Sequence, residues 1–127
     1  MSESIARARI ADAPGSVAEN GPGMPGYEWA GTDQAPVREL FPGVRLRSLW
    51  QGDNGATAHV LDMAPGSCWP RVDLHQPGPE EVFVLSGTFH DGVRAYPAGT
   101  FLHAPANSWH IPQTTTGCTL FVFYPEG

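Results

Sequence analysis

The sequence predicts an all-β domain preceded by an N-terminal arm, and three features of the chain support this prediction. From Tyr27 onward, short apolar runs alternate with turn-forming residues and show no periodicity of amphipathic helices. Glycine and proline are both frequent, with 15 and 13 residues among 127, which favours many turns and few long helices. Apolar residues make up 41% of the chain and charged residues 16%, so the chain can bury the core of one globular domain.

The chain begins with a segment of different composition, which is expected to be an arm outside the core. It is rich in alanine, glycine, proline and glutamate, and ENGPGMPG, Glu19–Gly26, is a run of residues that break helices and strands. A short helical turn is expected in it, around Ser4–Ala11. We assign residues 1–35 to this arm, which we expect to pack on a partner subunit, and residues 36–127 to a single domain.

Five apolar segments of the domain are predicted to be strands because turn-forming residues bound them. VRLRSLW alternates with a period of two, which is typical of a half-buried strand with Val44, Leu46 and Ser48 on one face. TAHVLDM lies between QGDNG and APG, and EVFVLSG lies between QPGP and FHDG. TFLHAP follows PAG and ends at a proline, whereas CTLFVFY is a continuous apolar run. The predicted strands are Val44–Trp50, Thr57–Met63, Glu81–Gly87, Thr100–Pro105 and Cys118–Tyr124.

The polar stretch DLHQPGPEE, which precedes one of these strands, is a candidate metal site. Glu80 has the strand parity of Val82 and Val84, so it points inward if those valines do. A carboxylate inside an apolar barrel is costly unless it is paired or bound to a metal. Asp73 and His75 also share a face in an extended chain, and carboxylates with imidazoles from neighbouring strands hold single divalent ions. The alternative is a loop whose polar side chains face water.

Two spacing patterns surround these residues. Gly66, His75, Glu80 and Gly87 fit the pattern G-x5-H-x-H-x3-4-E-x6-G, with Asp73 in the place of the first histidine and one residue more after the first glycine.

A second spacing pattern, G-x5-P-x-G-x2-H-x3-N, is matched by Gly99, Pro105 and His110. Asn107 takes the place of its second glycine, and Thr114 takes the place of its final asparagine. Asparagine accepts positive φ more readily than other non-glycine residues, so the exchange at position 107 preserves the turn.

Together the two patterns resemble the two motifs of the cupin superfamily, and the second half of the chain is similar to the cupin domains related to the anti-sigma factor ChrR. The resemblance covers Phe41–Tyr124 and implies a cupin double-stranded β-helix, which is a jelly-roll barrel. It also implies one divalent metal ion held by His75, Glu80 and His110. Asp73 is the fourth ligand candidate, and a site of two histidines and two carboxylates favours Fe(II), Mn(II) or Zn(II) over copper.

Two alternatives at this site stay open. In one, Asp73 points away and the two histidines form a triad with Glu80. In the other, the metal site has decayed and the barrel binds only an organic ligand.

Four further residues are candidates for a substrate pocket. His59 shares a face with inward apolar residues, although a histidine satisfied within the core is the simpler interpretation. His103 is either a pocket residue or a surface residue. Trp69 and Trp109 stand beside the ligand candidates in the sequence and are suited to a small, partly apolar molecule.

The resemblance also carries an expectation of function. The ChrR-like branch includes oxygenases that cleave small ketones and diketones, which implies a metal-dependent dioxygenase, with no catalytic residue assigned. The alternatives are a non-catalytic metal- or ligand-binding sensor module of the ChrR type and a cupin isomerase, because this fold hosts enzymes, binders and sensors.

Charge and cysteine content limit the other function classes. The net charge is −6 and the seven basic residues are scattered, so neither nucleic acid nor an anionic membrane is an expected partner. Cys68 and Cys118 are too few for a disulfide scaffold and lack the CxxC spacing. With no apolar signal segment at its start, the chain is expected to be cytoplasmic. It is also expected to form a homodimer through its arm and through outer apolar residues such as Phe83 and Leu85.

Overall fold

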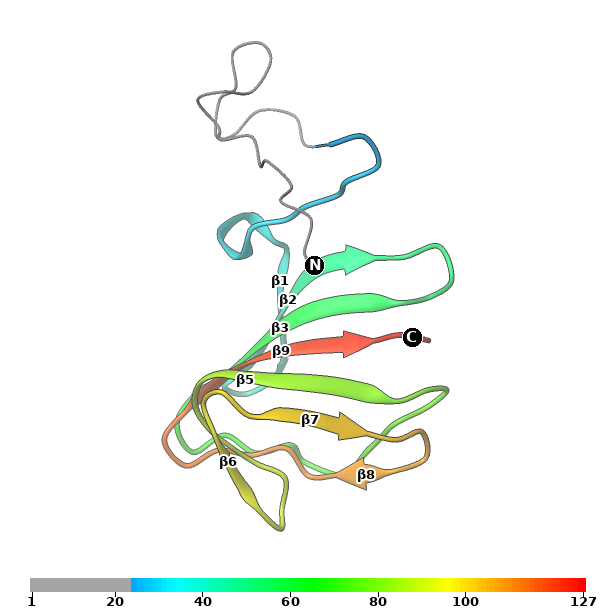
Figure 1. The fold of residues 1–127 in the computed structure, drawn as a ribbon. Coiled ribbons are helices and arrows are strands. Elements are labelled where there is room, and N and C mark those ends of the chain that lie inside the picture. The colour runs from blue at the N-terminus through cyan, green and yellow to red at the C-terminus, as the bar shows by residue number, and fades with distance from the viewer. Residues whose placement is uncertain (1–23) are drawn as a thin grey trace, which may run out of the picture.

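Antiparallel strands are the main secondary structure of residues 24–127, which are the residues that this computed structural model describes (Figure 1). A short 3-10 helix, Thr32–Gln34, precedes them. The helical turn expected around Ser4–Ala11 lies outside the described residues. In the described range, no helix is long and apolar enough to cross a membrane. The strands are β1 (Val37–Phe41), β2 (Val44–Gln51), β3 (Thr57–Met63), β4 (Asp73–Leu74), β5 (Glu80–His90), β6 (Ala95–Pro97), β7 (Phe101–Ala104), β8 (Trp109–His110) and β9 (Cys118–Tyr124).

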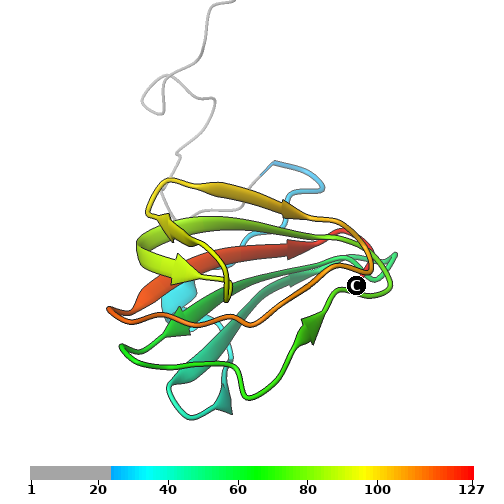
Figure 2. The same cartoon turned by 90° about the horizontal axis from the view of Figure 1, so that it is seen from below.

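The strands form one large sheet and one short pair. The large sheet has the order β1-β2-β3-β9-β5-β6, with β7 also paired to β5, and β4 pairs with β8. Figure 2 shows that the strands curve around a common interior, so one face of the large sheet points into a barrel. In the sheet, β9 lies between β3 and β5 and pairs with both, which places segments far apart in the sequence side by side.

All five predicted strands are present in this sheet. β3 and β9 have the predicted bounds, whereas β5 begins one residue before the predicted strand and continues to His90. The alternation predicted for β2 holds for Val44 and Leu46, which are buried and half-buried, and it ends at a bulge between Ser48 and Trp50. β1, β4, β6 and β8 were not predicted.

Glu80, one of the metal-ligand candidates, lies at the start of β5 on the inward face of the strand. Glu80, Val82 and Val84 are 4%, 3% and 0% exposed, so the carboxylate does share the buried face of the two valines. These valines pack in a core that continues across β3 and β9 through Leu61 and Leu120. The barrel wall therefore holds one carboxylate inside an apolar interior.

Two residues with positive φ, Gly87 in β5 and Asn107 in a turn, lie where neighbouring segments come close. Gly87 has φ 73°, and a Cβ built on it would lie 2.0 Å from the carbonyl oxygen of Gly117. Asn107 has φ 70°, and no other non-glycine residue in the described part of the chain has positive φ. The conformation expected for the asparagine of the second motif is thus observed.

Candidate metal centre

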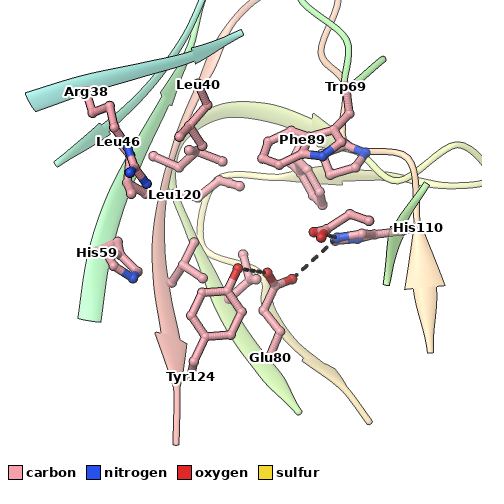
Figure 3. Close-up of a pocket in the computed structure, with 15 residues that line it drawn as sticks. Arg38, Leu40, Leu46, His59, Trp69, Glu80, Phe89, His110, Leu120 and Tyr124 are labelled. Atoms are coloured by element: carbon pink, nitrogen blue, oxygen red, sulfur yellow. Dashed lines mark hydrogen bonds and ion pairs between the residues drawn. The ribbon is translucent and has the colours of Figure 1, made fainter. Parts of the chain in front are cut away.

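Asp73, His75, Glu80 and His110 form a cluster that could hold a metal ion. Each offers one ligand atom, and these atoms all lie within 4.8 Å of one another. The pairing of β4 with β8 sets Asp73 opposite His110, and the start of β5 brings Glu80 to them from the large sheet. Figure 3 shows Glu80 and His110 facing each other at one end of a cavity.

Backbone hydrogen bonds hold the two motif segments together beside this cluster. The amide of His75 donates to the carbonyl of Ser108 at 2.9 Å, and the amide of Asn107 donates to the carbonyl of His75 at 2.7 Å. The turn at Asn107 therefore positions the loop that carries His75 against the strand that carries His110.

The ligand atoms of the cluster point at a common centre. The Nε2 atoms of His75 and His110 are 3.0 Å apart, and Asp73 Oδ2 lies 3.0 Å from His110 Nε2. Glu80 Oε1 lies 3.3 Å from His75 Nε2 and 3.5 Å from His110 Nε2. His75 and Glu80 are almost fully buried, whereas the side chains of Asp73 and His110 are 24% and 14% exposed.

The hydrogen bonds around His75 leave its Nε2 atom available as a ligand. Ser108 Oγ donates its one hydrogen to the carbonyl of Pro105 at 2.6 Å, so it can only accept from His75 Nδ1, which lies 2.9 Å away. The proton of the neutral imidazole then sits on Nδ1, and the lone pair of Nε2 points into the cluster. An outer hydrogen bond of this kind is typical of metal-binding histidines.

The two carboxylate oxygens of Glu80 differ in their contacts. Tyr124 Oη donates to Glu80 Oε2 at 2.6 Å, while Glu80 Oε1 is buried and, among residues 24–127, accepts no hydrogen bond and has only the ion-pair contacts with His75 and His110. Burial and the charge of Glu80 raise the pKa of Tyr124, so its hydroxyl stays a donor. A buried carboxylate oxygen without a partner is costly. The residues present therefore fit a divalent cation, which would satisfy this oxygen.

The ionisation of the cluster without metal follows from its geometry. Burial lowers the pKa of His75, but the adjacent carboxylates of Asp73 and Glu80 outweigh it and raise the pKa to about 9. Burial raises the pKa of Asp73, but the hydrogen bonds from His110 and His75 outweigh it and hold the pKa well below its usual range. Without metal, a protonated His75 therefore bridges the two carboxylates.

We predict that the metal-free protein loses stability as the pH rises from 6.5 to about 9, the ordinary and the folded pKa of His75. The raised pKa stabilises the folded state fully below pH 6.5, and that contribution, at most about 3 kcal/mol, disappears as His75 deprotonates. Bound metal needs neutral His75, so stabilisation by added Zn(II) should instead grow over the same interval. Urea unfolding of chelator-treated protein at both pH values checks this, and equal or greater metal-free stability at pH 9 would contradict it.

The cluster opens on a cavity of about 260 Å³ inside the barrel (Figure 3). Its wall is mainly apolar, with polar groups at two places. Asp73, Glu80 and His110 lie together at the metal end. Arg38 and His59 lie on the side opposite Glu80 and His110 (Figure 3). The apolar and aromatic lining residues are Leu40, Leu46, Leu61, Trp69, Val82, Phe89, Pro112, Leu120, Val122 and Tyr124.

The four predicted pocket residues lie in two different places. His59 and Trp69 line the cavity beside the cluster. His103 and Trp109 line a separate hollow of about 210 Å³, which His75, Glu80 and His110 also border. The side chain of His103 is 53% exposed and pairs with Glu81, so it lies on the outer side of β7.

Sequence reasoning did not single out three residues that contact or face this site: Arg38, Ser108 as a partner of His75, and Tyr124. The signal for Tyr124 was its parity with Leu120 and Val122 at the end of an apolar run. Arg38 was missed because VRELF, which lacks a period-two alternation of apolar and polar residues, was not assigned as a strand.

Comparison with known proteins identifies the family and the fold. A family model described as the ChrR cupin-like domain matches residues 28–126. A chain of the complex of Rhodobacter sphaeroides SigE with the anti-sigma ChrR is 28% identical, with a TM-score of 0.63, over 72% of this chain and 50% of that chain. The present chain thus spans half the length of that relative. No curated protein matches the sequence.

Two more distant structures share the fold. An RmlC-like cupin from Shewanella frigidimarina is 19% identical with a TM-score of 0.68, over 80% of this chain and 92% of that one. Hydroxypropylphosphonic acid epoxidase from S. wedmorenis is 16% identical with a TM-score of 0.66, over 77% of this chain and 59% of that one. The predicted all-β cupin fold is therefore confirmed, and the chain belongs to the family of ChrR cupin-like domains.

Proposed function

We propose that this chain is a metal-dependent oxygenase that acts on a small ketone or diketone. The observation that carries the proposal is the buried cluster of Asp73, His75, Glu80 and His110 at the end of an apolar cavity. Glu80 Oε1 and the Nε2 atoms of His75 and His110 lie within 3.5 Å of one another, which supports a divalent ion there. Proteins of this fold also include binders and sensors, so the proposal depends on this site rather than on the barrel.

The chain's own residues would bind and orient a substrate beside the ion. A bound Fe(II) or Mn(II) ion would supply open positions for chelating oxygens and for O₂. Tyr124 holds Glu80 in place, and the leucine and valine side chains of the cavity exclude water from the reacting atoms. With 2,4-pentanedione and one O₂, one carbon–carbon bond would break and both oxygen atoms would enter a two-carbon acid and a three-carbon ketoaldehyde, without an external reductant.

Oxygen consumption tests this proposal. Protein loaded anaerobically with Fe(II) is expected to consume one O₂ for each 2,4-pentanedione lost, and the Glu80→Gln variant is expected to consume none above the buffer rate. Glu81→Gln, a neighbouring change on the outer face of β5, should keep the activity. Protein that holds stoichiometric metal but consumes no O₂ with any small ketone or diketone would overturn the oxygenase proposal.

The second candidate is a non-catalytic sensor module. It is favoured by the 28% identity to a chain from the complex of the anti-sigma ChrR with SigE. In this case a ligand or metal should raise the unfolding temperature without being converted. Ligand-dependent stabilisation with unchanged ligand recovered from the mixture would support this candidate over the oxygenase.

We also propose that the chain forms a homodimer through the outer face of β5 and β7. Phe83 and Phe101 are neighbours in the register of these strands and are 39% and 60% exposed, and Leu85 beside them is 49% exposed. Adjacent exposed apolar side chains are typical of an interaction surface. Light scattering at micromolar concentration is expected to give the dimer mass for the wild type and the monomer mass for Phe101→Glu. Val93→Glu, at a site 92% exposed, should remain dimeric, and a monomeric wild type would contradict the proposal.

The boundary between an arm of residues 1–35 and a domain of residues 36–127, and the packing of that arm on a partner subunit, are also proposals. In the described part of the arm, Glu28 Oε1 accepts a hydrogen bond at 3.1 Å from Trp50 Nε1 on β2. This part of the arm therefore contacts its own sheet.

A further inference from the structure

We propose that the ligand of the cavity is a small carboxylic acid, whose carboxylate pairs with Arg38 while its other polar end reaches the metal centre. This inference rests on the proposed function, and it names the substrate class. It is carried by three features of the cavity: an unpaired cation, an unpaired buried imidazole nitrogen and an apolar stretch between them and the metal end.

Arg38 is the cation. It lies on the same face of β1 as Leu40, and both line the cavity. Its backbone is in register with Leu46 on β2, which is another lining residue. Arg38 is the only arginine or lysine of the lining, and among residues 24–127 no carboxylate forms an ion pair with it. Its side chain is exposed, so it stands at the mouth of the cavity, where an arriving anion meets it.

His59 supplies a second polar group on the same side. Its Nε2 atom lies 3.1 Å from Thr57 Oγ1, while its Nδ1 atom is buried and has no hydrogen-bond partner within the described residues. Burial and the charge of Arg38 lower the pKa of His59, which keeps the ring neutral. In the tautomer in which Thr57 Oγ1 donates to Nε2, the hydrogen of the neutral ring sits on Nδ1, which is then a buried donor without a partner. Buried polar atoms are usually hydrogen-bonded, so we expect a ligand oxygen to approach this side of the cavity.

The charges of the cavity favour a ligand's anionic group only on the side of Arg38 and His59. At the metal end, the two carboxylates of Asp73 and Glu80 balance a divalent ion. The charge of Arg38 has no such balance within the lining. Figure 3 shows Leu120 between the Arg38 and His59 side and the Glu80 and His110 side. The matching ligand therefore has an anionic group and a metal-chelating group joined by a short apolar spacer.

The volume of the cavity limits the size of this ligand. About 260 Å³ lies below the range of pockets that bury drug-sized molecules, roughly 300–1,000 Å³. A short keto acid or diketo acid fits this limit.

A matched pair of probes tests the inference. 4,6-Dioxoheptanoate and 2,4-heptanedione have the same carbon chain and the same diketone, and they differ only in a carboxylate in place of a methyl group. Calorimetric titration of the Mn(II)-loaded protein is expected to show about tenfold tighter binding of the acid, the lower end for a charge-assisted contact because Arg38 is exposed. Arg38→Met should abolish this preference, and Arg38→Lys should restore most of it. Arg45→Met, which removes a charge from β2 outside the cavity, should leave it unchanged.

The outcomes separate this inference from the proposed function. Equal binding of the two probes, or a preference that survives in Arg38→Met, overturns the inference, and if binding still needs Mn(II) the metal centre stands. An Arg38-dependent preference for the acid in protein that binds no metal supports the anion site while the proposed function fails. If neither probe binds with or without metal, both are overturned.

Discussion

Replacing Glu80 with glutamine is expected to reduce the affinity for a divalent ion by at least about 100-fold. Loss of an outer hydrogen-bond partner of a ligand typically costs about 10–100-fold, and loss of the charged ligand itself should cost no less. Glu80 is 4% exposed, and its Oε1 atom lies 3.3 Å from Nε2 of His75 and 3.5 Å from Nε2 of His110, where an ion bound by both histidines would contact it. Competition with a chromophoric chelator for Zn(II) measures the affinity.

The matched control is Glu81→Gln. Glu81 is the next residue, but it lies on the outer face of β5 and pairs with His103. This variant loses the same charge and should keep the affinity of the wild type within about twofold, because a surface ion pair contributes little. Equal affinities of Glu80→Gln and the wild type would remove Glu80 from the site.

The substitution Gly87→Ala is expected to destabilise the fold by at least about 3 kcal/mol. Gly87 has φ 73°, a conformation that costs an alanine about 1–2 kcal/mol. The added Cβ would also lie 2.0 Å from Gly117 O and 2.8 Å from the Cα of Cys118, and both are backbone atoms that cannot move alone. The hydrogen-bonded contact of β5 with β9 would have to shift.

Gly99→Ala separates the clash from the backbone strain. Gly99 has φ 91°, but a Cβ there would meet nothing within 4 Å, so only the strain of about 1–2 kcal/mol is expected. Urea unfolding of both variants and the wild type gives the two free energies. Equal losses in the two variants would show that the close approach at Gly87 is not what requires glycine.

The sequence was sufficient for the strands whose patterns are local. Apolar runs bounded by glycine and proline located β2, β3, β5, β7 and β9 because a buried strand needs little more than such a run. Strand parity also put Glu80 on the inner face, since side chains alternate strictly along an extended chain.

The remaining strands depend on tertiary pairing. β4 and β8 have two residues each and exist because Asp73 pairs with His110 and Leu74 pairs with Trp109 across the barrel. No local sequence pattern predicts that pairing. The resemblance to cupin motifs was therefore needed to group Asp73 with His110 before the structure showed their atoms 3.0 Å apart.

The pocket was harder to predict than the cluster, because a side chain's direction depends on which strand neighbours it. His103 lies in a predicted strand, but its pairing opposite Glu81 turns it to the outer face. Arg38 could not be considered while β1 was unassigned. Asp73 is the departure from the cupin pattern, and its Oδ2 points at the two histidines rather than away from them.

Asp73, His75, Glu80 and His110 are expected to bind one metal ion together. The most direct test is elemental analysis of protein purified without chelators or metal-affinity resin, alongside an Asp73→Ala variant. The wild type is expected to hold close to one equivalent of iron, manganese or zinc per chain, and the variant is expected to be depleted of it. A folded wild type that is free of metal and takes up none of these ions when they are added would contradict it.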